Sequence, residues 1–386
     1  MAHIHKRGDK WAYIVNIAQD PVTKKRRQVT KSGFRTKKEA QLAANKIEEA
    51  IVEGTVIHET KITFGQFAAE WAEYYGTQAK ISSVRARSIA MKHLVSEWGH
   101  LPLKKITRHM YQTYINALSQ KFSRNYIDSI HTTGNMIFKH AIRKDLLSRN
   151  PTEGFVMPKK QETVEEIEEE DIQEKFLELG ELKSFLAITK EHGLYMDYLS
   201  FVTLAYTGLR LGELLALKWT DVDFTKKTLR ITKTYYNPNN GQTAYQLLTP
   251  KTKKSVRTIS LDEDLITLLK KHRLEQRALK MKQRMIYQDN NFIFAENTGH
   301  PRNMKQVMNR LNRLLKLLNI DKHITPHSFR HTHTSLLIEA DAGVKEIQER
   351  LGHSDINTTM NIYAHMTKNV EEETSKRFSQ LTKGIL

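Results

Sequence analysis

Cysteine is absent from this chain of 386 residues, and its absence excludes several kinds of chemistry. Without cysteine there is no disulfide, no thiolate nucleophile and no cysteine-ligated zinc site. Long apolar runs are lacking too, because no segment approaches the roughly 20 apolar residues that span a bilayer. The N-terminus also lacks the apolar core of a signal peptide. The sequence therefore predicts a cytoplasmic protein with no membrane partner.

Negative charge is scarce relative to positive charge. The chain has 61 lysines and arginines against 43 acidic residues, a formal net charge of +18. A surplus of this size is typical of proteins that bind a polyanion, and nucleic acid is the expected partner. Hydrophobic residues make up 39% of the chain, which is enough for folded cores. The length predicts two or three domains.

Residues 1–58 are expected to form a small domain of a sheet and one helix. Two segments have strand composition and the segment between them carries hairpin turn residues: 10–18, 26–34 and 19–25. Thr36 fits a helix N-cap with Glu39 three residues later, and the helix is expected to reach Gly54. The basic hairpin tip is interpreted equally well as a solvated turn or a phosphate clamp. Its basic residues include Lys24, Lys25 and Arg27.

Residues 59–160 are expected to form a helical domain. Four segments have apolar residues three to four positions apart, the period of a helix with one buried face: 63–75, 82–98, 107–120 and 123–147. Asn150-Pro151 is expected to end the last helix. Several basic residues among these helices are either solvated or in contact with DNA; they include Arg85, Arg87 and Arg124.

An acidic stretch separates this domain from the next. Between Gln161 and Glu181 there are ten acidic residues and one lysine, which predicts a linker over 161–176 that DNA would repel. In the region 177–386 the pattern predicts two helices broken at Thr207-Gly208, then short strands and more helices. The strands are expected within 228–235, 243–250 and 255–261, and the helices within 262–285, 304–318, 327–340 and 344–351.

Unusual polar groups gather in this last region. Arg210 follows a glycine break, three lysines occupy an expected hairpin tip, and His327 and Arg330 share one face of a helix start. His353 follows another glycine and Tyr363 comes ten residues later. Two arginine forks can neutralise a phosphodiester in its transition state without a metal ion. A tyrosine activated by cationic neighbours can attack the phosphorus. His327 and His331 also have the spacing of a metal site, but HExxH and a carboxylate cluster are missing.

The order of these groups resembles the tyrosine recombinases, also called the phage integrase family. "TGLRLGELLALKWTDVD", "HSFRHTHTSLL" and "LGHSDINTTMNIYAH" are similar to the family's catalytic blocks. The resemblance implies that Tyr363 forms a 3′-phosphotyrosyl link, and that Arg210 and Arg330 clamp the phosphate with help from His327 and His353. A hairpin lysine would protonate the 5′ leaving oxygen. Lys251 precedes a threonine as in the family's pattern, with Lys253 as the rival. Glu213 is expected to orient a catalytic side chain, and no cofactor is expected.

The resemblance extends over nearly the whole chain. It implies a three-stranded arm-binding domain with a helix, a helical core-binding domain, and a mixed α+β catalytic domain over 177–386 with a C-terminal tail. The chain as a whole is therefore expected to be multidomain and mainly α-helical. Members similar to this chain come from conjugative transposons and from phages of Gram-positive hosts. Exposed strand residues of the arm domain are expected to enter a major groove, including Tyr13, Val15, Arg27 and Thr30.

The partner expected from the resemblance is double-stranded DNA carrying core and arm sites. A homotetramer on that DNA, an excision factor and a host DNA-bending protein are further expected partners. The predicted function is site-specific recombination that integrates and excises a prophage or other mobile element. Two alternatives stay open, a type IB topoisomerase-like relaxase and a DNA-binding regulator without catalysis.

Overall fold

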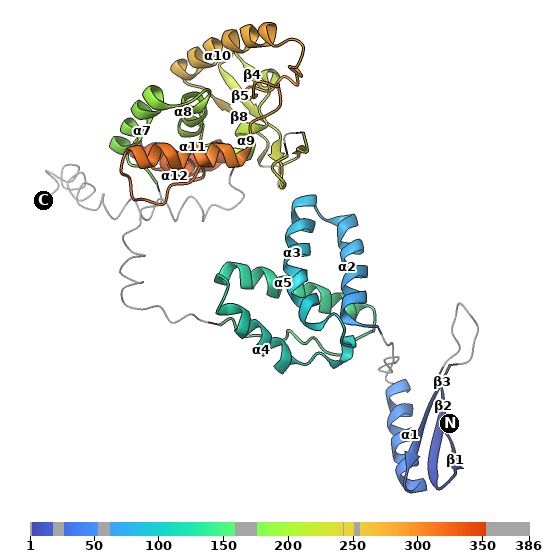
Figure 1. Cartoon of the computed structure of the whole chain (residues 1–386). Helices are drawn as coiled ribbons and strands as arrows, with labels where there is room; N and C mark the ends of the chain where they lie inside the picture. Colours follow the sequence, from blue (N-terminus) through green and yellow to red (C-terminus); the bar gives the residue numbers. More distant parts are fainter. Residues whose placement is uncertain are drawn as a thin grey trace, which may run out of the picture. The chain divides into compact units, whose positions relative to one another are not determined.

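The structure is a computed structural model that describes residues 2–17, 27–52, 62–158, 176–241, 243–250 and 255–352. The chain divides into two compact units, Met1–Gln161 and Glu162–Leu386. The first unit holds a small sheet with one helix and a separate helical bundle, and the second holds helices around small sheets (Figure 1). The expected multidomain, mainly helical fold is confirmed.

The N-terminal sheet has three antiparallel strands in chain order. They are β1 (His3–Arg7), β2 (Lys10–Ile17) and β3 (Arg27–Phe34), and helix α1 (Lys37–Val52) follows them. The predicted N-cap is present, because the Glu39 N–H donates to the Thr36 hydroxyl at 3.2 Å. The Glu39 carboxylate accepts from the N–H of Arg35 at 3.0 Å, one residue before the expected partner. These bonds fix where the helix begins.

Two residues of β2 are buried although the sequence interpretation expected them to be exposed. Tyr13 and Val15 were expected on an exposed strand face, but they are only 3% and 1% exposed and form a small core with Ala44 of α1. The prediction that they enter a DNA groove is therefore wrong. The open face of the sheet instead carries Asn16 and Thr30, with the side chain of Gln28 donating to that of Asn16 at 2.8 Å.

The helical bundle contains the four predicted helices. They are α2 (Phe64–Gln78), α3 (Ile81–Trp98), α4 (Arg108–Ser119) and α5 (Arg124–Arg143), with a short 3-10 turn η1 (Leu103–Lys105). Aromatic rings fill the core, where Phe64 packs on both Trp98 and Phe138. The expected end of the last helix is wrong. It stops at Arg143 rather than at Asn150-Pro151, because Asp145 has a positive φ of 56° and turns the chain away.

The second unit contains helices that pack on one another. They are α7 (Leu179–His192), α8 (Asp197–Thr207), α9 (Leu211–Leu215), α10 (Glu263–Lys282), α11 (Met304–Leu317), α12 (Ser328–Glu339) and α13 (Val344–Leu351). Helix α8 contacts α7, α10 and α12, so it is central (Figure 1). Phe329 of α12 is fully buried and packs against Phe185 and Phe201, which anchors the start of α12.

The strands of this unit form two small sheets. The elements are η2 (Trp219–Asp221), β4 (Val222–Asp223), β5 (Thr228–Ile231), β6 (Thr234–Tyr236), β7 (Gln246–Leu248) and β8 (Arg257–Ser260). One sheet has the order β4-β5-β8 and the other pairs β6 with β7. The segment predicted as a hairpin with a lysine tip therefore joins two strands, β7 and β8, that pair with different partners. That part of the prediction is wrong.

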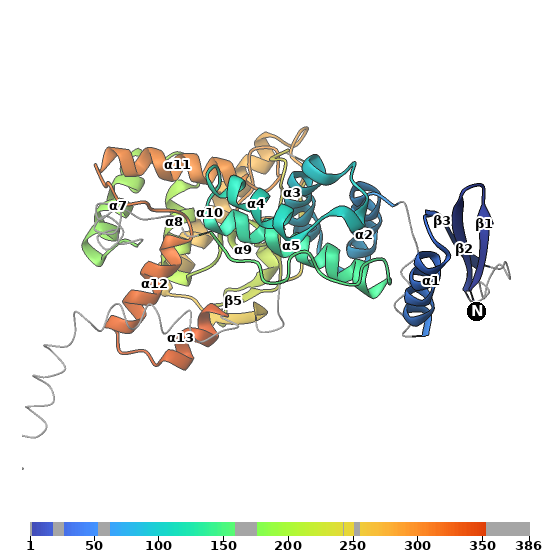
Figure 2. The ribbon, with the colours of Figure 1, turned by 90° about the horizontal axis from the view of Figure 1, so that it is seen from below.

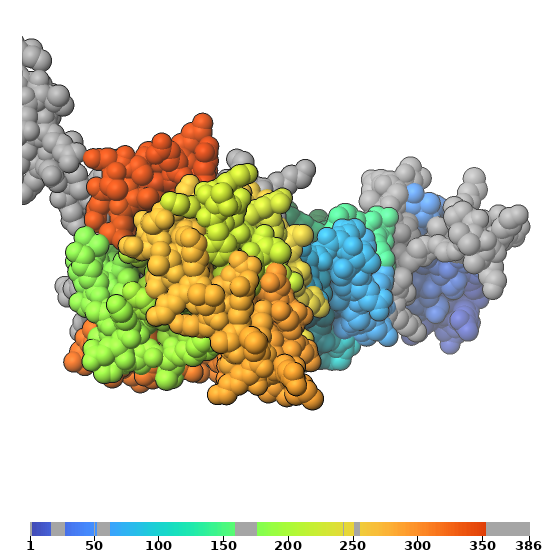
Figure 3. All heavy atoms as spheres, turned by 90° about the horizontal axis from the view of Figure 1, so that it is seen from above, coloured from blue at the N-terminus to red at the C-terminus, as the bar shows by residue number. Residues whose placement is uncertain are grey.

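These elements bring the ends of several helices together on one side of the unit. Helix α13 contacts both α12 and β8, and Figure 2 shows it beside the sheet. The break between α8 and α9 lies next to α12, because α12 packs along α8. Seen as spheres, the segments of the second unit, from bright green to orange, lie against one another in one continuous surface (Figure 3). Of the polar residues singled out in the sequence, Arg210, His327 and Arg330 lie at these helix ends.

Candidate active site

Arg210 is placed by a glycine. Helix α8 ends at Thr207, Gly208 takes a left-handed φ of 62°, and Arg210 is the N-cap of α9. A Cβ on Gly208 would lie 2.5 Å from Leu351 Cδ2 and 2.8 Å from His333 Cδ2, so only glycine fits. The predicted break at Thr207-Gly208 is confirmed, and it turns the chain so that Arg210 begins a new helix.

A buried carboxylate holds the Arg210 side chain. Glu213 is 3% exposed, and its Oε1 accepts from Arg210 Nη1 at 2.9 Å. The fork of Arg257 donates to the same carboxylate, at 3.0 Å from Nη2 and 3.3 Å from Nη1. Burial alone would raise the pKa of Glu213, but the hydrogen bonds and charge of Arg257, and then of Arg210, hold it below its usual value. Glu213 is therefore a carboxylate shared by two arginines, as the sequence predicted for an orienting residue.

Arg330 lies in the interior of the same region. It is 1% exposed, and its guanidinium donates to the carbonyls of Gly208 at 2.8 Å and Leu351 at 2.7 Å. Burial and the positive charge of Arg210 lower the pKa of Arg330 to about 9. Arg330 thus ties the α8–α9 break to the end of α13.

His327 stands at the start of α12 with its side chain exposed. The protein packed around its ring and the positive charges of His331, Arg330 and Arg210 lower the pKa of His327 to about 4. His327 is therefore neutral at pH 7 and can donate or accept a hydrogen bond. Its ring meets that of His331 edge-on, with 5.0 Å between the ring centres. His331 is half-buried behind it, as expected.

Arg210, His327 and Arg330 form one cluster, which is cationic through its two arginines because His327 is neutral at pH 7. The charge of Arg210 lowers the pKa of both other groups, so the three are electrostatically coupled. Like charges held this close repel one another, and a bound anion would relieve that repulsion. The planar forks of arginine match the oxygens of a phosphodiester. The cluster is therefore suited to bind a phosphate and to stabilise extra negative charge on it.

Sequence reasoning missed three residues of this region. His333 had no expected role, yet its Nδ1 is 2.8 Å from the Ala205 carbonyl and its Nε2 accepts from Arg350 Nε at 3.0 Å. Arg257 and Arg350 were not singled out at all. The signal in the sequence was only an arginine in a short strand and another in a helix, which are usually surface charges. Apart from the Ser255 carbonyl next to Arg257, their partners lie more than 15 residues away, so spacing could not reveal them.

Several predicted site residues lie outside the described part of the chain. They are Lys24, Lys25, Lys251, Lys253, His353 and Tyr363. The side chain of Arg27 is also not described, although its backbone pairs in β3. The acidic stretch predicted as a linker falls mostly outside the described residues as well. For all of these the sequence interpretation stays a prediction.

The basic residues of the helical bundle differ in their surroundings. Arg85 and Arg124 are exposed. Arg87 is half-buried and donates to the Ser129 carbonyl at 3.1 Å and to the Thr133 hydroxyl at 3.2 Å, which ties α3 to α5. Arg85 and Arg124 thus fit a DNA-facing role better than Arg87 does.

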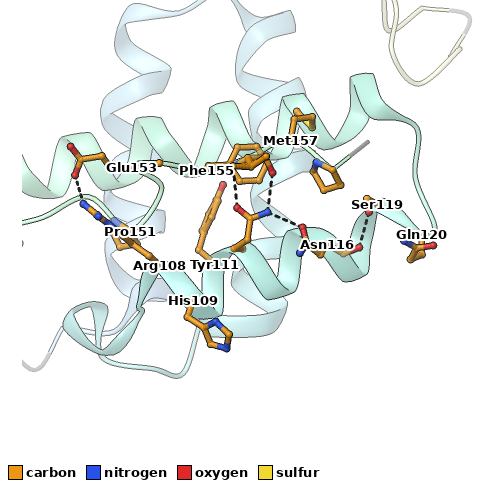
Figure 4. Close-up of a pocket in the computed structure, with 14 residues that line it drawn as sticks. Arg108, His109, Tyr111, Asn116, Ser119, Gln120, Pro151, Glu153, Phe155 and Met157 are labelled. Carbon is orange, nitrogen blue, oxygen red and sulfur yellow. Dashed lines mark hydrogen bonds and ion pairs between the residues drawn. The ribbon is translucent and has the colours of Figure 1, made fainter. Parts of the chain in front are cut away.

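A groove of about 900 Å³ lies between α4 and the segment that follows α5. Gln112 makes two bonds to the backbone of Val156, accepting at 3.0 Å and donating at 2.9 Å. Figure 4 shows the groove in close-up, with Arg108 of α4 directed toward Glu153. Its rim carries a salt bridge between Arg108 and Glu153 at 2.5 Å. None of the residues predicted to act in chemistry lines this groove.

Within residues 2–352, apart from the gaps named above, no three His, Asp or Glu side chains are grouped so as to hold a metal ion. Nor does any helix in the described part of the chain have the length and apolar character needed to cross a membrane.

Family models match three successive parts of the chain. The arm DNA-binding domain model matches residues 3–51, and the N-terminal SAM-like domain of phage integrases matches residues 63–119. The phage integrase family model matches residues 175–370, half of the chain. All the residues of the cationic cluster lie within the last match.

Individual proteins agree with these models. The integrase of Staphylococcus phage L54a is 32% identical in an alignment of 340 positions that covers 83% of this chain and 93% of that protein. The Tn1549 transposon integrase bound to transposon right end DNA has a TM-score of 0.64 at 24% identity, covering 82% of this chain and 99% of that one. A lambda integrase tetramer bound to a Holliday junction has a TM-score of 0.56 at 15% identity, covering 94% of each chain. At these identities the two structures show the shared fold alone.

Proposed function

The chain belongs to the phage integrase family of tyrosine recombinases, and from this premise we propose which of its residues perform strand cleavage and rejoining. Its activity is site-specific recombination that integrates and excises phage or conjugative elements. The observation that supports the residue assignment is the cationic cluster of Arg210, His327 and Arg330, in which Arg330 of α12 bonds to the carbonyl of Gly208 just before Arg210.

In this proposal the cluster binds the scissile phosphate. Arg210 and Arg330 donate to its non-bridging oxygens and offset the charge that develops when the phosphorus is attacked. His327, which is neutral before the phosphate arrives, donates a hydrogen bond to one of these oxygens. Phosphate binding adds negative charge next to the ring and so raises the pKa of His327 from about 4.

Tyr363 is the proposed nucleophile and His353 its assistant in hydrogen bonding and proton transfer. The phenolate attacks the phosphorus, the bond to the 5′ oxygen breaks, and a 3′-phosphotyrosyl ester conserves the energy of the original bond. Lys251 protonates the leaving 5′ oxygen, with Lys253 as the alternative donor. Rejoining reverses these steps with a 5′ hydroxyl from the partner strand, and no cofactor takes part.

We further propose which part of the DNA each domain binds. Residues 1–58 bind arm sites through the open face of the sheet, which carries Asn16, Gln28 and Thr30. Residues 59–160 bind the core site, with phosphate contacts from exposed arginines such as Arg85 and Arg124. Residues 161–176 link this domain to the catalytic domain, residues 177–386. The basic tip at Lys24 and Lys25 adds phosphate contacts on the arm.

On DNA the protein acts as a homotetramer in this proposal, since the lambda relative forms a tetramer on a Holliday junction. Exchange between two duplexes involves four strands, and a tetramer supplies one active site for each. An excision factor and a host DNA-bending protein are proposed accessory partners, and the reaction takes place in the bacterial cytoplasm.

The test of this assignment uses DNA with a nick close to the crossover point of its attachment site. Incubation with the purified protein in EDTA, followed by a denaturing gel, should give a slowly migrating protein–DNA adduct. Tyr363→Phe should bind the same DNA and give no adduct, whereas Tyr206→Phe, an exposed tyrosine of the same domain, should react like the wild type. An adduct that persists in Tyr363→Phe would show that the nucleophile is another residue.

A second measurement separates the recombinase from its alternatives. A topoisomerase-like relaxase removes the supercoils of a plasmid even when the plasmid carries no attachment site. A non-catalytic regulator binds its site without forming an adduct. The recombinase should instead require two sites and yield recombined product. Relaxation without any site would support the topoisomerase-like alternative.

A further inference from the structure

The buried side chain of Arg257 contacts two parts of the catalytic domain that are far apart in sequence. On one side it binds Glu213, and on the other it binds the carbonyl of Arg350. We propose that Arg257 is a positioning residue of the active site, which holds the phosphate-binding side chain of Arg210 and the C-terminal end of α13 in a fixed position relative to each other. The contacts that do this, from Arg257 to Glu213 and to the Arg350 carbonyl, are called the frame below. This inference rests on the proposed function, because it assumes that Arg210 binds the scissile phosphate.

The first half of the frame is the chain of contacts from Arg257 to Arg210. Both Nη atoms of Arg257 face the Glu213 carboxylate, an arrangement that fixes the plane of the carboxylate. Arg210 Nη1 then donates to Glu213 Oε1, the oxygen that also faces Arg257 Nη1. The direction of the Arg210 fork therefore depends on a carboxylate that Arg257 holds.

The second half of the frame is the end of α13. The last carbonyls of a helix have no partner within the helix. Arg257 Nε donates to the Arg350 carbonyl at 2.7 Å, and Arg330 Nη2 donates to the next carbonyl, that of Leu351, at 2.7 Å. Gly352 then ends the helix with a left-handed φ of 68°. Two arginines thus fix the point from which the chain continues to His353 and Tyr363.

Charge explains why the frame is built around Glu213. Arg210, Arg257 and Arg330 are three cations in one region, and Arg210 and Arg257 both lower the pKa of Arg330. Glu213 is 3% exposed and Arg257 is 8% exposed, so their opposite charges largely cancel inside the protein. Without Arg257 the buried carboxylate would attract Arg210 more strongly and draw it away from the phosphate.

Arginine is required at this position because three of its nitrogens are used. Nε donates to the Arg350 carbonyl, both Nη atoms donate to the Glu213 carboxylate, and Nη1 also donates to the Ser255 carbonyl at 3.2 Å. A lysine ammonium cannot reach all of these acceptors. Arg257→Lys keeps the positive charge and loses the geometry. Arg257→Lys therefore tests the geometry alone, whereas Arg257→Met removes both the positive charge and the geometry.

The experiment measures single-turnover adduct formation on the nicked attachment site with the full chain in excess. Arg257→Lys should bind the DNA within about twofold of the wild type and form the adduct about 10-fold to 100-fold more slowly, even at saturating protein. Arg230→Met is the matched control, since Arg230 lies exposed on the neighbouring strand β5. It should react at the wild-type rate. Thermal unfolding of each variant establishes that it is folded under the assay conditions.

A double-mutant cycle tests the path through Glu213. If Arg257 acts on Arg210 through the carboxylate, Glu213→Gln combined with Arg257→Lys should be about as slow as the slower single variant. Independent residues would instead multiply their losses. DNA with a neutral methylphosphonate at the scissile position should reduce the defect of Arg257→Lys, because that group carries no charge for Arg210 to neutralise.

Three outcomes would overturn the inference. They are a wild-type adduct rate in folded Arg257→Lys and Arg257→Met, multiplied losses in the double variant, and an equal defect on phosphate and methylphosphonate DNA. Failure of the proposed function would give a different set of results. In that case the wild type itself forms no adduct, or Tyr363→Phe still forms one.

Discussion

His333 is a buried histidine whose protonation state is set by its two neighbours. Its Nε2 accepts a hydrogen bond from Arg350, so that nitrogen carries no proton. Nδ1 therefore carries the proton and donates it to the Ala205 carbonyl. Burial and the charge of Arg350 lower the pKa of His333 to about 4. The neutral ring thus joins α8 to α13 through one donor and one acceptor.

This arrangement predicts that the catalytic domain loses stability in mild acid. A histidine whose pKa is lower in the folded state takes up its proton on unfolding, so its contribution is complete above about pH 6.5 and declines as the pH falls toward 4. The full effect is roughly 3 kcal/mol. Urea midpoints of the catalytic domain at pH 7.5 and 5 should differ less in His333→Gln than in the wild type. His323→Gln, an exposed histidine, should keep the wild-type difference. Equal differences in all three proteins would contradict the assignment.

His140 is a second buried histidine, in the helical bundle, and it has no such partners. It is 5% exposed, and neither ring nitrogen has a hydrogen-bond partner among the described residues. Its ring stacks on Tyr74 with 4.5 Å between the centres. His140→Phe should keep the stacking and remove two unsatisfied nitrogens, which stabilises the bundle by about 1 kcal/mol. Hydrogen exchange of α2 and α5 amides should slow accordingly, while exposed His100→Phe leaves it unchanged.

At the scale of elements, the break between α8 and α9 positions Arg210. Gly208 combines a left-handed φ with close contact to Leu351 and His333. Gly208→Ala should therefore destabilise the domain by roughly 2 to 4 kcal/mol, from backbone strain and overpacking together. Adduct formation should also slow, because the Gly208 carbonyl is a partner of Arg330.

Gly180→Ala is the control for this substitution. Gly180 lies in α7, and an added Cβ there meets nothing within 4 Å. Alanine favours a helix more than glycine does, so the control should be as stable as the wild type or slightly more stable. Comparable urea midpoints for the two variants would mean that the glycine break is not under steric constraint.

The same elements show which features a sequence reveals. Helix periodicity predicted α2, α3, α4, α11 and α13 to within a few residues, because each buries one face. The segment 228–235 was predicted as one strand but forms β5 and β6, since Lys233 at the bend binds Asp221 at 2.6 Å. That contact is tertiary and leaves no local signal. In β2 both faces contain apolar residues, so alternation could not tell that Tyr13 faces α1.

The candidate site likewise contains some residues that the sequence predicted and others that it did not. Arg210, His327 and Arg330 were predictable because their residue types and order resemble a family. Arg257 and Arg350 act through backbone carbonyls and a buried carboxylate that only the fold brings near them. Arg330 was predicted as a phosphate ligand, and its bonds to Gly208 and Leu351 give it a structural task that the sequence did not indicate. Side chains with long-range partners escape prediction from spacing.

At the scale of the whole molecule, positive charge is distributed unevenly along the chain. Residues 1–61 hold 13 lysines and arginines against seven acidic residues, and the stretch from Gln161 to Glu181 is strongly acidic. Binding that releases counterions from DNA grows with the number of phosphates neutralised and weakens as salt is added. Each basic domain should therefore contribute its own part to the salt dependence of binding.

Removal of the N-terminal domain tests this division. A chain of residues 62–386 should form the adduct on a nicked core site at a rate within about threefold of the full chain, because the cationic cluster is intact. Its binding to DNA with both arm and core sites should be weaker, with a shallower slope of log affinity against log salt. Fluorescence anisotropy over a series of salt concentrations measures both. In the full chain, alanine at Asn16, Gln28 and Thr30 should reduce discrimination between arm sequences and leave the slope unchanged, because these polar side chains would read bases rather than phosphates. An unchanged slope after removal of residues 1–61 would mean that the basic N-terminal domain does not touch DNA.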